Sequence, residues 1–140
     1  MGRVIYLDTA FCVYLIEDQG LRGIRARELL DFDEEFAISP LVLMECLVKP
    51  LRDSNTTLED DYRKTLKEFH LLDISPAAYE RAARLRAATG IKTPDAIHWA
   101  TATLSGCAEL WTGDAALAAK SAGFAVDRFA DELSSLSRHR

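Results

Sequence analysis

The chain has 140 residues, of which 49% are hydrophobic and 28% charged, and its formal net charge is −5. This length suits a single domain, no apolar run approaches the about 18 residues of a membrane span, and the apolar run at the N-terminus is too short for the one expected in a signal peptide. The acidic balance argues against broad, non-specific nucleic-acid binding, which needs a basic face. We therefore expect a cytoplasmic protein with one domain over residues 1–133 and a polar tail over residues 134–140.

The first half of the chain alternates between strand and helix patterns. Buried-strand patterns cover residues 3–7 and 35–39, and helical patterns cover residues 9–18, 24–30 and 58–69. A further helix is predicted to start at Ser39 and Pro40, an N-cap residue followed by proline at the first helical position. We expect it to end at Lys49, because Pro50 follows.

The second half continues the alternation. Strands are predicted over residues 71–75, 108–112 and 125–129, and helices over 76–89, 93–106 and 115–122. Gly90 is expected to end the first of these helices. Strands separated by helices imply crossover connections, and hence an α/β three-layer sandwich around a mostly parallel sheet of four to five strands. Functional sites in such folds form at the carboxyl ends of the strands.

Four acidic residues fall at or shortly after those strand ends: Asp8, Glu45, Asp95 and Asp114. Asp8 and Asp114 could serve only as helix N-caps, and Asp95 could serve only to complement a helix dipole. Glu45 lies in an apolar helical stretch, where a pair with Lys49 would contribute only about 0.2–0.5 kcal/mol. A buried acid at that position needs a stronger reason, such as a bound cation.

The predicted sheet brings these four acids into one crevice, where their charges repel. Two unit charges about 4 Å apart at an effective dielectric constant of about 20 cost about 4 kcal/mol, so the cluster either takes up protons or binds a cation. Oxygen ligands favour Mg²⁺ or Mn²⁺ over zinc. Such an ion can activate water for attack on phosphorus, so the pattern favours phosphodiester hydrolysis.

The sequence blocks around the four acids resemble those of the PIN-domain family, in the same order and over nearly the whole chain. The blocks are "VIYLDTA" with Asp8, "SPLVLMECLVKPLR" with Glu45, "IKTPDAIHWATA" with Asp95, and "LWTGDAALAA" with Asp114. The chain length and the second and third blocks are most similar to VapC-type toxins of toxin–antitoxin pairs.

This resemblance implies an Mg²⁺- or Mn²⁺-dependent endoribonuclease that cuts tRNA or ribosomal RNA, forms a homodimer and is held in check by a cognate antitoxin. By the motifs, Asp8, Glu45, Asp95 and Asp114 would form the metal site and the catalytic centre. Thr112 matches a hydroxyl residue common before the fourth acid and could hydrogen-bond to the metal shell. Alternatively, it is an ordinary hydroxyl at the end of a strand.

Several basic residues lie near these motifs. His98 follows Asp95 by three residues, and it is either a catalytic base or a histidine that packs near the site or bonds to a backbone carbonyl. Lys49, Arg52 and Lys92 could bind RNA phosphates as substrate-binding residues, or they could form solvated salt bridges.

Two other functions fit parts of the sequence. A non-catalytic module with the same fold could bind RNA or protein. Leu117 and Ala118 favour it, because many family members carry a further acid in this stretch. An aspartyl-phosphate domain of the haloacid-dehalogenase or receiver type would also place an aspartate after a strand, but "LDTA" lacks the second acid of that motif.

Overall fold

A five-stranded parallel sheet forms the centre of the computed structural model, which describes residues 2–31 and 33–129. The strand order is β3-β2-β1-β4-β5. The strands are β1 (Val4–Leu7), β2 (Glu35–Ile38), β3 (His70–Leu71), β4 (Glu109–Thr112) and β5 (Ala125–Asp127). The parallel sheet expected from the sequence is confirmed, whereas the expected tail over residues 134–140 lies outside the described residues.

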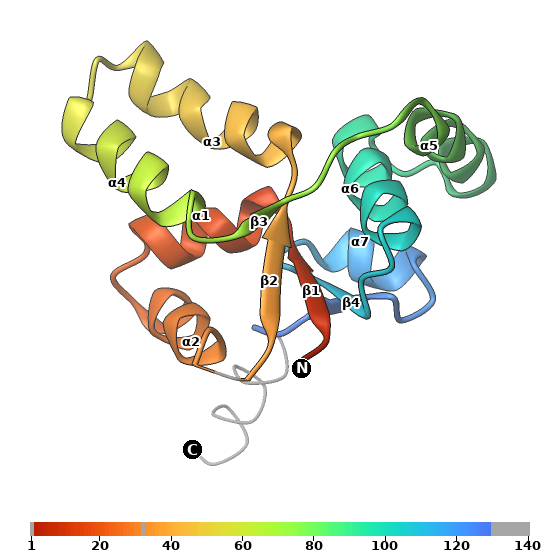
Figure 1. Ribbon diagram of the computed structural model, residues 1–140, viewed down its shortest axis with the longest axis horizontal. Helices are drawn as coiled ribbons and strands as arrows, with labels where there is room; N and C mark the ends of the chain where they lie inside the picture. Colours follow the sequence, from red (N-terminus) through yellow and green to blue (C-terminus); the bar gives the residue numbers. More distant parts are fainter. Residues whose placement is uncertain (1, 32, 130–140) are drawn as a thin grey trace.

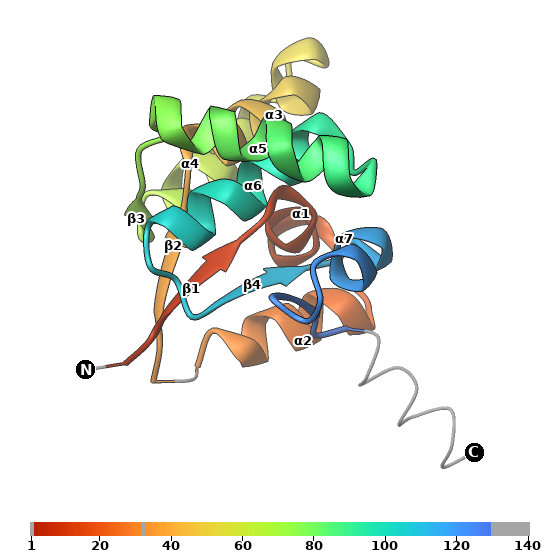
Figure 2. The same ribbon diagram turned by 90° about the vertical axis from the view of Figure 1, so that its right-hand side faces the viewer.

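Helices cover both faces of the sheet. They are α1 (Thr9–Glu17), α2 (Leu21–Leu29), α3 (Pro40–Arg52), α4 (Thr56–Leu66), α5 (Pro76–Thr89), α6 (Thr93–Leu104) and α7 (Ala115–Lys120). Figure 1 shows α1 to α4 on one side of the sheet and α5 to α7 on the other, which confirms the three-layer arrangement. In the view turned by 90°, α5 packs along α6 (Figure 2). Within the described ranges, no helix combines the length and the apolar character that crossing a membrane requires.

The strand order determines where a site can form. From β1 the chain proceeds to β2 and β3 on one side, and it later returns to β4 on the other side of β1. The crossover direction therefore reverses between β1 and β4, and ligand sites in open parallel sheets lie at the carboxyl ends beside such a reversal. Asp8 follows β1 at this point, and its backbone N–H bonds to the Trp111 carbonyl of β4 at 3.2 Å.

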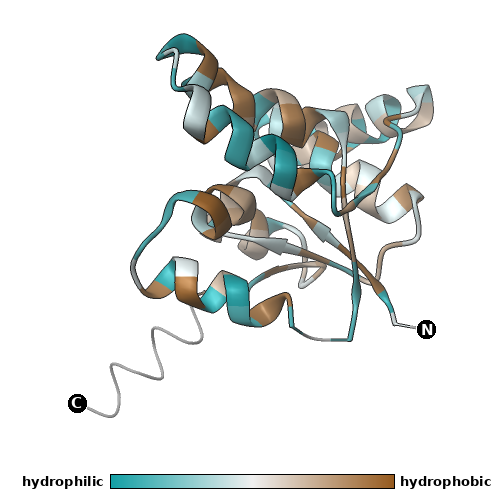
Figure 3. Ribbon diagram, turned by 60° about the vertical axis from the view of Figure 1, so that its left-hand side comes forward, coloured by the Kyte–Doolittle hydropathy of each residue, from teal (hydrophilic) through white to brown (hydrophobic). Residues whose placement is uncertain are grey.

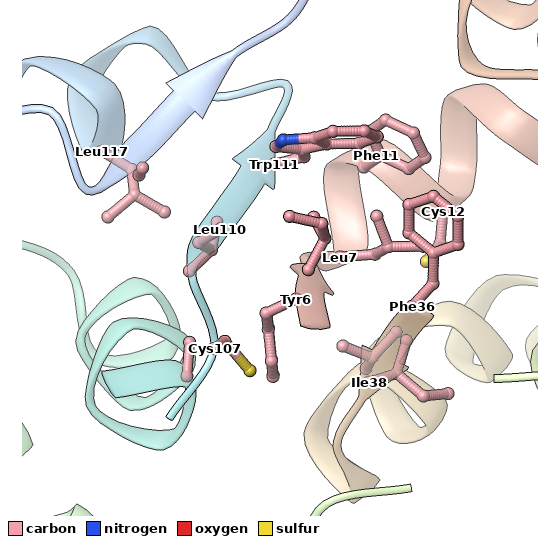
Figure 4. Packing of buried hydrophobic residues seen from close by; sticks show 14 of the residues in the cluster. Tyr6, Leu7, Phe11, Cys12, Phe36, Ile38, Cys107, Leu110, Trp111 and Leu117 are labelled. Atoms are coloured by element: carbon pink, nitrogen blue, oxygen red, sulfur yellow. The ribbon is translucent and has the colours of Figure 1, made fainter. Parts of the chain in front are cut away.

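The core surrounds β1, the middle strand. Ile5, Tyr6 and Leu7 are all fully buried, as expected for a parallel strand with helices on both faces. Trp111 of β4 lies beside Phe11 of α1, with ring centroids 6.0 Å apart (Figure 4). Along the outer helices, hydrophobic and hydrophilic residues alternate (Figure 3). The core thus holds the carboxyl end of β1 rigidly between two helical layers.

The prediction that α3 ends at Lys49 is wrong, because the helix continues through Pro50 to Arg52. A proline in a helix removes one backbone donor, but near the last turn this costs only one hydrogen bond. The Pro50 ring is also buried in the structure. The helix then ends at Asp53, whose N–H bonds to the Lys49 carbonyl at 3.0 Å.

The edge strand β3 is shorter than the predicted strand over residues 71–75. It pairs with β2 only through His70 and Leu71, and both side chains are exposed. Hydrophobic pattern alone did not reveal this, because the apolar residues after Leu71 pack against the core, while the pairing with β2 ends at a bond from the Leu72 N–H to the Ile38 carbonyl at 2.8 Å.

Candidate active site

Asp8 is held in place by hydrogen bonds to both carboxylate oxygens. It is the N-cap of α1, where Oδ1 accepts from the Phe11 N–H at 2.9 Å. Oδ2 accepts from the hydroxyl of Thr112 at the end of β4. Asp8 is only 2% exposed, and this burial raises the pKa of its carboxyl group above the ordinary value. The N-cap explanation is therefore correct, and it places a buried acid at the reversal point of the sheet.

Thr112 connects Asp8 to the fourth acid. While its hydroxyl donates to Asp8, the same oxygen accepts from the Asp114 N–H at 2.8 Å. Asp114 in turn caps α7, because its Oδ1 accepts from the N–H groups of Ala116 at 2.8 Å and Leu117 at 3.3 Å. The residue predicted to support the site thus orients two of the acids.

Asp95 lies in the first turn of α6, near enough to Asp114 for the charge of that carboxylate to act on it. Burial and the nearby Asp114 charge, with a smaller contribution from Asp8, raise the pKa of Asp95 to about 6. The structure therefore brings Asp8, Asp95 and Asp114 together as electrostatically coupled carboxyl groups.

Glu45 is bonded in a different way from the other three acids. Its Oε1 accepts from the Thr9 hydroxyl at 2.6 Å and faces His98 Nε2 at 2.9 Å. Burial opposes ionisation, but hydrogen bonds from His98 and Thr9 hold the pKa of Glu45 below its ordinary value. Other protein groups therefore already compensate the Glu45 charge.

His98 is a buried member of a hydrogen-bond chain. Its Nδ1 lies 2.7 Å from the Tyr6 hydroxyl, which lies 2.7 Å from the hydroxyl of Ser39. His98 is thus packed beside the site, as one of the expected readings had it, but its ring bonds to side chains and not to a backbone carbonyl. Ser39 does occupy the N-cap position of α3, but its side chain bonds to Tyr6 instead of capping the helix.

Sequence reasoning missed Tyr6, Thr9 and Ser39 as parts of this site. Thr9 had a usable signal, because it directly follows Asp8 in the first motif. No such signal marks Tyr6, which belongs to an apolar strand, or Ser39, which belongs to an ordinary helix start.

The acids fit a hard divalent cation in their chemistry. All are oxygen donors, and no Lys or Arg of the described residues forms an ion pair with Asp8, Asp95 or Asp114. The pKa values of Asp8 and Asp95 are raised by burial and by neighbouring carboxylates, and a bound cation would offset both effects. In their present positions, no three acidic, His or Cys side chains of the described residues are close enough to bind one ion. Binding of one ion by three of these groups would therefore require their side chains to move.

Two of the three predicted RNA-binding residues form ion pairs. Lys49 Nζ lies 2.7 Å from Glu17 Oε1, and Arg52 Nε lies 3.1 Å from Asp53 Oδ1. Both pairs are more than half exposed on the basic side, so the solvated salt bridges considered from the sequence are present. Lys92 is exposed at the N-cap position of α6. Contact of these three residues with RNA stays a prediction.

The chain is similar to known proteins in both sequence and structure. The family model described as PIN domain matches residues 5–122. A chain of a toxin–antitoxin complex from Klebsiella pneumoniae is 30% identical, with a TM-score of 0.73, and the match covers 89% of this chain and 98% of that one. No curated protein sequence matches at a significant level.

Two further structures share the fold at lower identity. VapC20 of Mycobacterium tuberculosis, a toxin that cleaves the sarcin–ricin loop, is 20% identical with a TM-score of 0.70 over 86% of this chain and 95% of its own. A chain of VapBC2 from Rickettsia felis, solved bound to promoter DNA, is 21% identical with a TM-score of 0.66 over 79% and 87%. The chain is therefore a member of the PIN-domain family, with VapC-type chains of toxin–antitoxin complexes among its structural relatives.

Proposed function

We propose that the protein is a Mg²⁺-dependent endoribonuclease, with Mn²⁺ able to substitute, and that it acts as the toxin of a toxin–antitoxin pair. The observation that carries the proposal is the coupled group of Asp8, Asp95 and Asp114 at the sheet reversal. Burial and mutual repulsion raise the pKa values of Asp8 and Asp95, so the group is poised to take up positive charge.

Each acid has a distinct part in this site. Asp8, Asp95 and Asp114 would hold the cation directly or through water, and Glu45 would complete the set. When bound, Mg²⁺ supplies a Lewis acid that lowers the pKa of water and offsets charge on the phosphate. Thr112 keeps Oδ2 of Asp8 oriented, and the two N-caps prevent Asp8 and Asp114 from rotating away.

Partners are proposed on the strength of the relatives. The Klebsiella chain belongs to a toxin–antitoxin complex, which supports a cognate antitoxin, and cleavage of the sarcin–ricin loop by VapC20 supports an RNA substrate of the tRNA or ribosomal class. Met44, Val48 and Leu51 form an exposed apolar stripe along α3, each more than half exposed. Such a stripe provides area for a protein partner, either the antitoxin or the second subunit of a homodimer.

An RNA cleavage assay tests the proposed activity. Antitoxin-free protein should cut a tRNA and ribosomal RNA pool in Mg²⁺ or Mn²⁺, and EDTA should stop it. Asp95→Asn should abolish cleavage while leaving the circular dichroism spectrum unchanged. Absence of metal-dependent cleavage of any RNA in the pool by wild type would contradict the proposal.

A second candidate is a non-catalytic module that binds RNA or protein. Two observations favour it: Glu45 is bonded to Thr9 and His98, and no three acidic, His or Cys side chains of the described residues are close enough to hold one ion. Calorimetry with Mn²⁺ separates the two candidates, since a nuclease must bind the ion and an interaction module need not.

A further inference from the structure

Five side chains from four different elements and one helix cap form a continuous hydrogen-bond chain that ends on Glu45. It runs from Ser39 to Tyr6, then to His98 and to Glu45, where Thr9 joins it. Ser39 and Tyr6 are fully buried and His98 is 2% exposed. Buried polar groups at this density are costly unless each has a partner, and here each does.

Every hydrogen bond along this series of side chains donates in the direction of Glu45. An ionised carboxylate can only accept, so Oε1 of Glu45 requires a hydrogen on His98 Nε2. In neutral imidazole Nδ1 then has no hydrogen and accepts from the Tyr6 hydroxyl. A phenol keeps its hydrogen at neutral pH, so the Tyr6 hydroxyl has one to donate. The Tyr6 oxygen is left to accept from Ser39.

Glu45 needs such support because its position in the chain offers none. Asp8 and Asp114 are fixed by free N–H groups at the start of their own helices. Glu45 lies inside α3, where the backbone N–H groups are already used within the helix. Its carboxylate can be oriented only by side chains that reach it from elsewhere, here Thr9 of α1 and His98 of α6.

This hydrogen-bond chain leaves one carboxylate oxygen of Glu45 available. Oε1 receives two donors, whereas Oε2 takes part in no hydrogen bond to the residues that the structure describes. We infer that His98, anchored by Tyr6 and Ser39, is a positioning residue that holds Oε1 of Glu45 so that Oε2 can bind the divalent cation. This inference rests on the proposed nuclease function, because it assigns His98 to the support of the same metal site.

The ring nitrogens of His98 provide a direct test in metal-free protein. Long-range ¹H–¹⁵N correlation spectra should show hydrogen on Nε2 and none on Nδ1, and His98→Asn identifies the signal among the three histidines. A spectrum with hydrogen on Nδ1 alone would overturn the inference. This measurement does not depend on metal binding or on activity.

Two substitutions at His98 separate positioning from packing. The amide nitrogen of Gln reaches the place of Nε2, whereas that of Asn reaches only the place of Nδ1. In Mn²⁺ titration calorimetry we expect His98→Asn to bind about tenfold more weakly than wild type and His98→Gln to recover most of that loss. Equal affinities for wild type and folded His98→Asn would overturn the inference, and so would equal losses in both variants.

Tyrosine variants provide a matched pair. Tyr6→Phe removes the anchor of His98 and should weaken Mn²⁺ binding by about threefold, a smaller effect because the Glu45 contact remains. Tyr62→Phe is the control, because Tyr62 is also buried and also donates to a carboxylate, that of Glu17. It should leave Mn²⁺ affinity unchanged, and an equal loss in both would contradict a role specific to Tyr6. If wild type itself binds no Mn²⁺, the proposed function fails, while the ring-nitrogen result still tests the hydrogen-bond chain.

Discussion

Two parts of the acidic site differ in how their charge is balanced. Asp8, Asp95 and Asp114 lie near one another, no Lys or Arg of the described residues forms an ion pair with them, and the pKa values of Asp8 and Asp95 are raised. Glu45 receives hydrogen bonds from Thr9 and His98, and its pKa is lowered. The first part is held in an unfavourable state that a cation would relieve, whereas the second is already stable. The neighbours of a carboxylate in this fold thus decide whether its negative charge is destabilised by repulsion or stabilised by hydrogen bonds.

The largest expected effect is on RNA cleavage, where both parts are needed. Asp8→Asn and Glu45→Gln should each lower the cleavage rate by at least about 100-fold, because even residues that only support metal ligands cost 10- to 100-fold. Initial rates on a fixed RNA substrate in saturating Mg²⁺ measure this. Full activity of Glu45→Gln would show that the Glu45 carboxylate is not needed for cleavage.

The next effect concerns the stability that a cation gives. At Mn²⁺ concentrations about 100 times the dissociation constant, the free energy of unfolding should rise by about 2.7 kcal/mol. Urea unfolding with and without Mn²⁺ measures the change. In Asp8→Asn the same Mn²⁺ concentration should give much less stabilisation, and an undiminished gain would place the ion elsewhere.

In metal-free protein, replacing Asp95 and replacing Glu45 by their amides should change the free energy of unfolding in opposite directions. Asp95→Asn should stabilise on the order of 1 kcal/mol, since it removes repulsion from a half-exposed carboxyl group whose full shift is reduced by solvent. Glu45→Gln should destabilise by a similar amount, because it weakens two hydrogen bonds to a charged acceptor. Denaturation midpoints of the two variants and of wild type without metal test this. A shift of both midpoints in the same direction would contradict the proposed difference between Asp95 and Glu45.

The same contrast predicts a pH dependence. The pKa of Asp95 is about 6 in the folded protein against 3.8 ordinarily, so between these values the native state binds more protons than the unfolded state. Its contribution to stability therefore falls as the pH rises from about 4 to 6 and stays low above that. The lowered pKa of Glu45 has the opposite sign, because its contribution is present above the ordinary pKa and is lost on acidification. Metal-free Asp95→Asn should show a smaller fall between pH 4 and 6 than wild type, since the raised pKa of Asp8 contributes in the same direction.

The smallest effect is expected at the predicted RNA contacts. Lys49→Ala breaks an exposed ion pair with Glu17, so its cost in stability should be about 0.5 kcal/mol. If Lys49 binds phosphate, the same variant should raise KM for RNA while leaving kcat nearly unchanged. An unchanged KM would show that Lys49 forms the ion pair with Glu17 but does not contribute to RNA binding. Arg52→Ala and Lys92→Ala allow the same comparison.

The sequence allowed the parallel sheet and the convergence of three acids to be predicted, for physical reasons. Alternating strand and helix patterns imply crossovers, and crossovers bring strand ends to one edge, where Asp8 and Asp114 lie. Helix-start signals at Thr93 and Pro94 likewise placed Asp95 in a first turn.

The separate bonding of Glu45 could not be predicted in this way. It depends on His98 and Tyr6, which are 53 and 39 residues away from Glu45 in the chain and meet it only through the packing of α3, α6 and β1. The continuation of α3 through Pro50 was missed for a similar reason, since burial of the ring outweighed a local rule.

The central claim is that Asp8, Asp95 and Asp114 share a divalent cation at the carboxyl ends of β1 and β4. Anomalous diffraction from crystals grown with Mn²⁺ tests it most directly. The account predicts one strong peak within coordination distance of these three carboxylates, with Glu45 Oε2 turned toward it. Well-ordered crystals with no peak there, or with the ion bound only at another surface, would contradict it.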